Sequence, residues 1–284
     1  MPLVVPITSV DDPRVEPFSC VRDRDLAGRE GAFLAESEVV VRVLLTQGRY
    51  RVRSLLLEER RVQKMHDVID PLPDDVPVYV MPQAAMDRLA GFPIHRGVLA
   101  LADRGTPVAA DALLAPSDHV LDRSARGSER PRLVVGLMGL SNHDNVGGIF
   151  RSAAAFAIDG VLCDSTTCDP LYRKAIRVSV GGALVMPFAR CESEGALLSL
   201  LASHDYELIA LTPRGETEIG ELEAAAPGHR RALLLGAEGP GLSDAVLAKT
   251  RRVRIDMGGV MDSLNVSVAC GIALHALRTR NARL

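Results

Sequence analysis

The stretch Gly236-Ala237-Glu238-Gly239-Pro240-Gly241 decides how this chain is interpreted, together with Asp262-Ser263-Leu264-Asn265-Val266-Ser267-Val268 further on. Glycine has no side chain, so a glycine-rich turn lets a ligand approach the main chain. Polar residues that open an otherwise apolar helix place hydroxyl and amide groups at its N-terminal end. The two segments together predict a binding site in the last third of the chain.

A third segment of the same kind lies upstream, Asn145-Val146-Gly147-Gly148-Ile149-Phe150-Arg151. Each of the three lies between a strand-like run and a helix-like run. Their order, Asn-x-Gly-x-x-x-Arg, Gly-x-Glu-Gly-x-Gly and Ser-Leu-Asn-Val-Ser, resembles the three motifs of the SpoU/TrmH-type RNA 2′-O-ribose methyltransferases of the SPOUT superfamily. One such motif alone is a weak signal, whereas three in the family's order form a specific one.

The part of the chain that carries these motifs alternates between strand-like and helix-like runs. Strands are expected at 133–138, 160–163, 207–211, 232–236 and 253–256, and helices at 147–158, 171–180, 195–204 and 263–278. Continuous apolar strands that alternate with helices predict an α/β fold with a buried parallel sheet. Ligands bind at the carboxyl ends of such strands, and the three motifs fall there.

The first hundred residues predict a smaller α/β unit. Helices are expected at 35–47, 58–69 and 84–89, and strands at 52–57, 76–81 and 97–102. The periodicity then lapses, so the expected division is a domain at 1–105, a linker at 106–131 and a second domain at 132–284. Within the linker, 122–131 has the composition of a flexible excursion. Its arginines are interpreted as solvated rather than as phosphate contacts.

Composition narrows the classes of protein that the chain can represent. The 284 residues suffice for two ordinary domains, and the hydrophobic content of 47% comes in short runs. No apolar run approaches the ~20 residues of a membrane span, and Met1 to Pro6 lacks the pattern of a signal peptide. A soluble, cytoplasmic protein is therefore expected.

Charge and aromatic content limit how this chain could hold a nucleic acid. The net charge of −3 argues against bulk electrostatic binding, so an RNA partner would meet local basic patches. Aromatic residues make up only 4% of the chain, which argues against a base-stacking platform. The five cysteines, an odd number without a Cys-x-x-Cys pair, predict neither disulfides nor a zinc site, and no metal is expected (Cys20, Cys163, Cys168, Cys191 and Cys270).

The resemblance to this family implies a fold, a cofactor and an assembly that composition and periodicity do not indicate. It implies a catalytic domain with a deep C-terminal trefoil knot that binds S-adenosylmethionine in a bent form and acts as a homodimer. Asp12-Pro13-Arg14-Val15 and the segment 31–36 resemble the L30e-like substrate-binding domain that precedes many such domains. Ser37 and Arg96 stand where the family commonly has glycine and glutamine, so the resemblance leaves substrate choice open.

The residues of the first motif have competing interpretations. Arg151 lies among small and apolar residues, where an arginine is most often a surface residue with a buried stem. Asn145 can cap the helix, and Gly147 and Gly148 would leave its first turn open to an anion. The resemblance implies that Arg151 meets phosphate or ribose. Because a guanidinium stays protonated, Arg151 is expected to stabilise the developing alkoxide and position the adjacent phosphate rather than to act as a base.

The other two motifs supply the remaining catalytic candidates. Glu238 is interpreted either as an exposed turn residue or, preferably, as the ion-pair partner of Arg151. Asn265 is either a simple helix cap or, with Ser263 as the cap, an amide free to donate and accept at once. In that second interpretation, Asn265 and Ser263 orient the nucleophile and the cofactor.

Carried over to this chain, the resemblance implies a complete set of ligand contacts. S-adenosylmethionine is expected to touch main chain near Thr212, Gly236, Ile255, Met257 and Leu264. Asp256 stands where the family commonly has proline, and this is expected to loosen the cofactor loop. RNA is expected at Asn145 and Arg151, and secondarily at Lys174 and Arg177, whose helix-surface charges are otherwise interpreted as solvated.

The predicted function is therefore S-adenosylmethionine-dependent methylation of a ribose 2′-hydroxyl in structured RNA, with rRNA preferred over tRNA as substrate. The alternative is a non-catalytic, ribosome-associated RNA-binding protein that keeps the fold. A dehydrogenase is disfavoured because no Gly-x-Gly-x-x-Gly follows the first strand of either domain. A homodimer is expected to form through one face of the last helix (Ala269, Ile272, Ala273 and Ala276).

Overall fold

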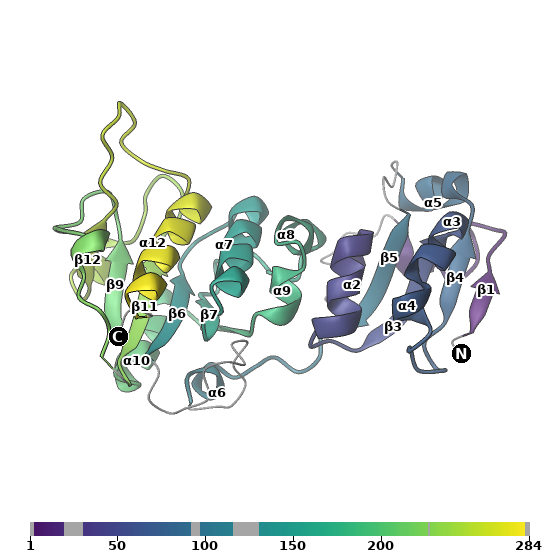
Figure 1. Ribbon diagram of the computed structural model, residues 1–284, viewed down its shortest axis with the longest axis horizontal. Coiled ribbons are helices and arrows are strands. Elements are labelled where there is room, and N and C mark those ends of the chain that lie inside the picture. Colours follow the sequence, from purple (N-terminus) through teal and green to yellow (C-terminus); the bar gives the residue numbers. More distant parts are fainter. Residues whose placement is uncertain (1–2, 20–30, 92–96, 116–130, 227, 282–284) are drawn as a thin grey trace. The chain divides into compact units, whose positions relative to one another are not determined.

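The computed structural model describes residues 3–19, 31–91, 97–115, 131–226 and 228–281 (Figure 1). The chain divides into two compact units. The first comprises Met1–Thr106 and Leu171–Val185, and the second comprises Pro107–Pro170 and Met186–Leu284. No helix in the described part of the chain is both long and apolar enough to cross a membrane.

The first unit is built on a five-stranded mixed sheet in the order β1-β4-β3-β5-β2. The strands are β1 (Val4–Pro6), β2 (Ala32–Glu36), β3 (Val52–Glu58), β4 (Val78–Met81) and β5 (Val98–Asp103). β5 runs antiparallel to both of its neighbours, and the other pairs are parallel. The helices here are η1 (Glu16–Phe18), α2 (Glu38–Gln47), α3 (Glu59–Val62), η3 (Gln63–Met65), α4 (His66–Ile69) and α5 (Gln83–Ala90).

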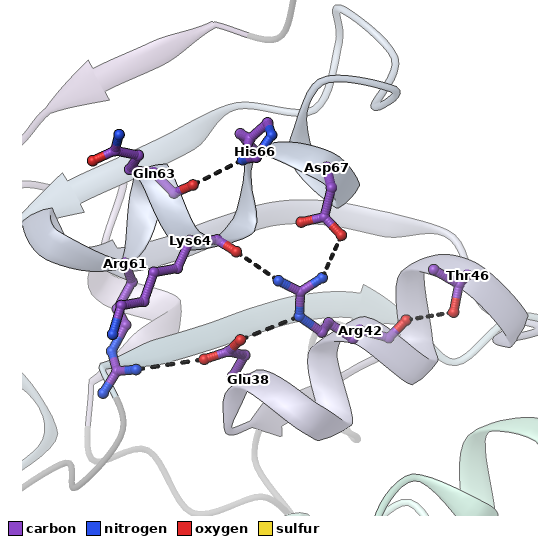
Figure 2. Close-up of polar contacts among 8 residues, drawn as sticks. All are labelled: Glu38, Arg42, Thr46, Arg61, Gln63, Lys64, His66 and Asp67. Carbon is purple, nitrogen blue, oxygen red and sulfur yellow. Dashed lines mark hydrogen bonds and ion pairs between the residues drawn. The ribbon is translucent and has the colours of Figure 1, made fainter.

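A polar network ties α2 to the segment that runs from α3 to α4 (Figure 2). The Arg42 guanidinium donates to the Glu38 carboxylate at 3.2 Å, to Asp67 at 2.7 Å and to the Lys64 carbonyl at 2.6 Å. Arg61 reaches the second oxygen of Glu38 at 3.4 Å. Arg42 thus satisfies a main-chain carbonyl that the short η3 helix leaves open.

The first unit also includes a segment from much later in the chain. The expected helix 171–180 is instead two short helices, α8 (Arg173–Val178) and α9 (Gly182–Val185), which belong to this unit. Between them Gly181 has φ +85°, and a Cβ there would lie 2.9 Å from Val43 of α2. The Arg49 N–H donates to the Leu184 carbonyl at 3.3 Å. The segment therefore packs on α2 through contacts that only glycine allows.

The second unit is built on the predicted parallel sheet, with strands in the order β10-β12-β9-β11-β6-β7-β8. All of its neighbouring strands pair in parallel. The strands are β6 (Arg132–Leu137), β7 (Gly160–Cys163), β8 (Phe188–Arg190), β9 (Glu207–Leu211), β10 (Thr217–Glu218), β11 (Arg230–Leu235) and β12 (Arg251–Arg254). β8 and β10, the two edge strands, were not expected.

Helices surround this sheet. They are α6 (Ala110–Leu114), α7 (His143–Ala155), α10 (Glu194–Ser203), η4 (Ile219–Glu221), α11 (Asp244–Leu247) and α12 (Val266–Asn281). Residues of α6, α10 and α11 join strand residues in one buried cluster. α7 and α12 pack side by side, and their buried residues do not belong to that cluster (Figure 1).

The first part of the expected linker is packed rather than free. Val108 forms a parallel bridge with Ala189 of β8, and Leu113 and Leu114 of α6 are buried. A Cβ at Gly160 would lie 2.8 Å from Leu113, so the absence of a side chain there admits α6. Residues 116–130, which hold nearly all of the expected excursion at 122–131, lie outside the described residues.

Candidate active site

A pocket of about 510 Å³ lies at the carboxyl edge of the second unit's sheet, where β9, β11 and β12 end. Its wall includes all five positions expected to contact the cofactor, and three of the four expected catalytic residues (Thr212, Gly236, Ile255, Met257 and Leu264; Glu238, Ser263 and Asn265). The rest of the lining is mostly small or apolar. The fourth expected catalytic residue, Arg151, is not part of the wall.

The glycine-rich turn after β11 has its shape because of its own backbone. A Cβ at Gly236 would lie 2.3 Å from the main chain of Gly241, so only glycine fits there. The Gly241 N–H donates to the Ala237 carbonyl at 3.0 Å and closes the turn. Gly239 and Gly241 have φ of +84° and +71°, which favour glycine. The turn thus presents main chain to the pocket.

A buried amide joins the three motifs. The Asn145 side chain, in a residue only 3% exposed, donates through Nδ2 to Glu238 Oε1. Its Oδ1 accepts from Asn265 Nδ2 at 2.9 Å. We call Glu238, Asn145 and Asn265 the polar bridge. Sequence analysis missed it, because it treated Asn145 as a helix cap.

The expected capping roles of Asn145 and Ser263 are wrong, whereas the interpretation of Asn265 as a helix cap is confirmed. α7 begins at His143, and its cap is Asn142, whose Oδ1 accepts from the Asp144 N–H at 2.9 Å. Asn265 itself caps α12, because its Oδ1 accepts from the N–H and the hydroxyl of Ser267 at 2.9 and 2.7 Å. Ser263 donates instead to the neighbouring Asp262 at 3.1 Å. The amide of Asn265 is therefore largely committed.

The expected ion pair between Arg151 and Glu238 is also wrong. Arg151 is exposed and forms no ion pair within the described residues, while Glu238 accepts a hydrogen bond from Asn145. Helix geometry gives the reason. Six residues of an α-helix at 100° each turn Arg151 about 240° away from Asn145, onto another face of α7.

Gly148 serves helix packing rather than anion access. A Cβ there would lie 2.8 Å from both Cβ and Oγ of Ser267 on α12. Gly271 of α12 similarly faces Ser152 of α7, with 3.4 Å from its would-be Cβ to the hydroxyl. Small residues on both helices therefore allow the close approach of α7 and α12 that brings Asn145 to Asn265.

Asp164 anchors the loop that leads into α7. Its carboxylate accepts from the Gly139 N–H at 3.2 Å, from both the N–H and the hydroxyl of Thr167, and from the Thr166 hydroxyl. Burial by itself would raise the pKa of Asp164, but these hydrogen bonds outweigh it and hold the pKa below its ordinary value. Asp164 is thus an anion built into the loop after β7.

The described cysteines have no sign of nucleophilic chemistry. Burial raises the pKa of the Cys163 and Cys270 thiols to about 12, and that of Cys168 to about 11. A thiolate is therefore rare at neutral pH, and none of these residues lines the pocket. Within the described ranges, no group of three or more His, Cys, Asp or Glu side chains is arranged to hold a metal.

The face of α12 expected to form a dimer contact is only partly exposed. Ala273 is fully buried in its own unit. The exposed apolar residues follow helical spacing at Leu264, Val268 and Ile272, with exposures of 41%, 52% and 41%. The available stripe therefore overlaps the expected face only at Ile272, and it includes the pocket residue Leu264.

The fold is shared with solved RNA methyltransferases. A structure described as an RNA 2′-O ribose methyltransferase has a TM-score of 0.76 at 24% identity, covering 98% of this chain and 100% of that one. The SpoU methyltransferase AviRb from Streptomyces viridochromogenes, in complex with its cofactor AdoMet, has a TM-score of 0.76 at 21% identity, covering 95% and 100%. The architecture is thus that of the SpoU/SPOUT methyltransferases.

Sequence comparison then identifies the family of this chain. The model of the SpoU rRNA Methylase family matches residues 132–275. An uncharacterized tRNA/rRNA methyltransferase of Mycobacterium tuberculosis is 37% identical over 277 residues, which cover 95% of this chain and 90% of that protein. The chain belongs to the SpoU family and is an RNA methyltransferase.

Proposed function

We propose that this protein transfers the methyl group of S-adenosylmethionine to a ribose 2′-hydroxyl of structured RNA, with rRNA preferred over tRNA. The observation that carries the proposal is the polar bridge at the rim of the pocket. The family membership supports methyl transfer to RNA. A fold shared with a 2′-O ribose methyltransferase agrees with ribose as the acceptor.

The pocket fits the proposed cofactor. Its volume of about 510 Å³ lies within the range of about 300 to 1,000 Å³ that is usual for small-molecule sites. The adenine and ribose would meet main chain near Thr212, Gly236, Ile255, Met257 and Leu264. S-adenosylmethionine, when bound, supplies an electrophilic methyl on a sulfonium. The chain's own contribution is orientation and charge.

Asn265 orients the attacking hydroxyl in this proposal. Its Oδ1 is held by Ser267 and one N–H by Asn145, so one N–H is left to donate to the developing alkoxide. Glu238 is exposed at the pocket, and Asn145 occupies only one of its oxygens. Glu238 holds Asn145 and, through it, Asn265 in place, while the hydroxyl proton leaves to an RNA phosphate or to water. Ser263 lines the same wall and orients the cofactor.

Arg151 has a different place in the proposal. It lies outside the pocket wall and is exposed, so its guanidinium is available to an RNA phosphate. Lys174 and Arg177 are carried by α8, which belongs to the first unit. We assign them to the substrate-binding function proposed for the L30e-like unit, residues 1–105. Asn145, buried in the bridge, then acts through Asn265 rather than on RNA.

The proposed assembly is a homodimer. Each catalytic domain is proposed to contain the trefoil knot of the family. The support is the exposed apolar stripe of Leu264, Val268 and Ile272, which can form a self-complementary contact about a two-fold axis. Light scattering at micromolar concentration measures the mass directly. A monomer would contradict this part of the proposal.

Methyl transfer to defined RNAs tests the chemistry. The purified protein is incubated with radiolabelled S-adenosylmethionine and with rRNA or tRNA transcripts, and the methylated nucleotide is mapped. An RNA with a single 2′-deoxy substitution at that nucleotide should accept no methyl there, and Arg151→Ala should slow turnover by about 10²- to 10³-fold. Methylation of the base, or full turnover by Arg151→Ala, would contradict the mechanism. Failure to bind the cofactor in calorimetry would favour the non-catalytic alternative.

A further inference from the structure

Two of the loops that line the pocket are joined by one arginine. Thr212 and Pro213 line the pocket from the loop after β9, and Ile255 and Met257 line it from the loop after β12. Arg254, the last residue of β12, lies outside the lining. Its Nη1 donates to the carbonyls of Gly215 and Glu216 at 3.1 and 2.9 Å, and its Nε donates to Asp256 Oδ1 at 2.6 Å.

We propose that Arg254 and Asp256 are positioning residues that set the spacing of these two loops and thereby the affinity for S-adenosylmethionine. The inference rests on the proposed cofactor. It also stands against the expectation that Asp256, which occupies a position where the family commonly has proline, loosens this loop. The Asp256 carboxylate accepts a hydrogen bond from Arg254, and this bond holds the loop after β12 in place of a proline.

The loop after β9 offers a firm support. The Gly215 N–H donates to the Thr212 carbonyl at 3.0 Å, and the Glu216 N–H donates to the Arg252 carbonyl at 3.1 Å. A Cβ at Gly215 would lie 2.2 Å from the main chain of Val253, so this turn is pressed against β12. Arg254 extends that support past the end of the strand to the residues on either side of Asp256.

The solvent exposure of Arg254 and Asp256 indicates which of their bonds contributes most to holding the two loops. The side chains of Arg254 and Asp256 are 34% and 64% exposed, and an exposed ion pair by itself stabilises little. Hydrogen bonds from a charged donor to main-chain carbonyls are stronger. Removal of the guanidinium should therefore weaken cofactor binding more than removal of the carboxylate.

A matched control lies two residues away on the same strand. Arg252 pairs with the Glu216 carboxylate, so it reaches the same loop as Arg254. Within the described residues its guanidinium makes no hydrogen bond or ion pair with residues 255–257, so its loss should leave both pocket walls joined. Arg252→Met and Arg254→Met remove the same charge and the same donors from one strand.

Calorimetry with S-adenosylmethionine on the full chain tests the proposal, with circular dichroism melts as a check on folding. Arg254→Met should raise Kd about tenfold and Asp256→Ala about threefold, whereas Arg252→Met should change Kd less than twofold. Asp256→Pro, which fixes φ near −65°, should bind better than Asp256→Ala. If Arg254→Met unfolds, Asp256→Ala still decides, because it keeps the carbonyl bonds.

The outcomes separate this inference from the function on which it rests. A wild-type chain that does not bind S-adenosylmethionine would overturn the proposed function itself. A wild-type chain that binds, with Arg254→Met and Asp256→Ala binding equally well, would overturn the bracing role alone. Equal loss in Arg252→Met and Arg254→Met would also overturn it, since the effect would then follow the charge of the strand.

Discussion

Exchanging the amide and the carboxylate of the polar bridge tests whether the three motifs act as one unit. Asn145→Asp keeps the shape of the side chain and the oxygen that accepts from Asn265. It replaces the donor to Glu238 with a second oxygen, so two carboxylates face each other where a hydrogen bond was. The variant should leave the fold of the unit intact and disturb the rim of the pocket.

The magnitude follows from the lost bond and the new repulsion. A hydrogen bond to a charged group contributes about 1.5 to 3 kcal/mol. Two like charges about 4 Å apart repel by about 1 kcal/mol in bulk water, and this lower limit is appropriate because Glu238 is exposed. The sum, about 2.5 to 4 kcal/mol, corresponds to a loss of about 10² to 10³ in turnover if the bridge is intact in the transition state.

The assay is the rate of methyl transfer at saturating cofactor and RNA. Combining Asn145→Asp with Glu238→Gln re-creates the hydrogen bond with the donor on the other side. The double variant should turn over within about tenfold of wild type, well above Asn145→Asp alone. Wild-type turnover by Asn145→Asp, or a double variant no faster than it, would refute the reasoning.

Three further predictions concern stability and reactivity. Ser37 has φ +92° and ψ 148°, a region that only glycine visits freely, so Ser37→Gly should raise the free energy of unfolding by about 1 kcal/mol in urea titration; a loss of stability would speak against strain there. Asp164→Asn should destabilise the protein by about 1.5 to 3 kcal/mol at pH 7. Because the pKa of Asp164 is lowered on folding, the wild-type advantage should be complete above pH 5 and shrink as the pH falls through 3.8 and below; a difference independent of pH would exclude its charge as the cause. Cys163 and Cys270, with thiol pKa values near 12, should resist alkylation by iodoacetamide at pH 7.5 until urea unfolds the chain, and rapid labelling of the folded protein would show that they are accessible.

The sequence carried enough information for the parallel sheet but not for every packing partner. The run from Leu133 to Met138 has no polar residue. Such a continuous apolar run is typical of a strand that is buried on both faces of a parallel sheet. α8 and α9 show the limit. The buried face of a short helix shows that it packs, but nothing in Ile176 or Leu184 indicates that α8 packs on β2 and α9 on α2. Such pairings depend on contacts far apart in the chain.

The pocket residues followed from strand ends and glycines, whereas the polar bridge did not. Asn145 and Asn265 are 120 positions apart, and no local pattern connects them. Two of the errors had a signal within the sequence. Asn142 is of a residue type that caps helices, and α7 begins directly after it, four residues before the expected start at 147. The six residues from Asn145 to Arg151 place them on different faces of any α-helix, so both could not meet Glu238.

The close packing of α7 on α12 determines whether the polar bridge can form at the rim of the pocket. Gly148 lies one turn after Asn145 on the same face of α7, and a Cβ there would lie 2.8 Å from the hydroxyl of Ser267. That hydroxyl donates to Asn265 Oδ1 at 2.7 Å, and Asn265 donates to Asn145 at 2.9 Å. A side chain at position 148 would therefore push Ser267, and with it Asn265, away from the bridge. Gly148, which follows the glycine of the first motif, thus acts on the reacting centre through the distance between two helices, because that distance decides whether the amides of Asn145 and Asn265 can meet.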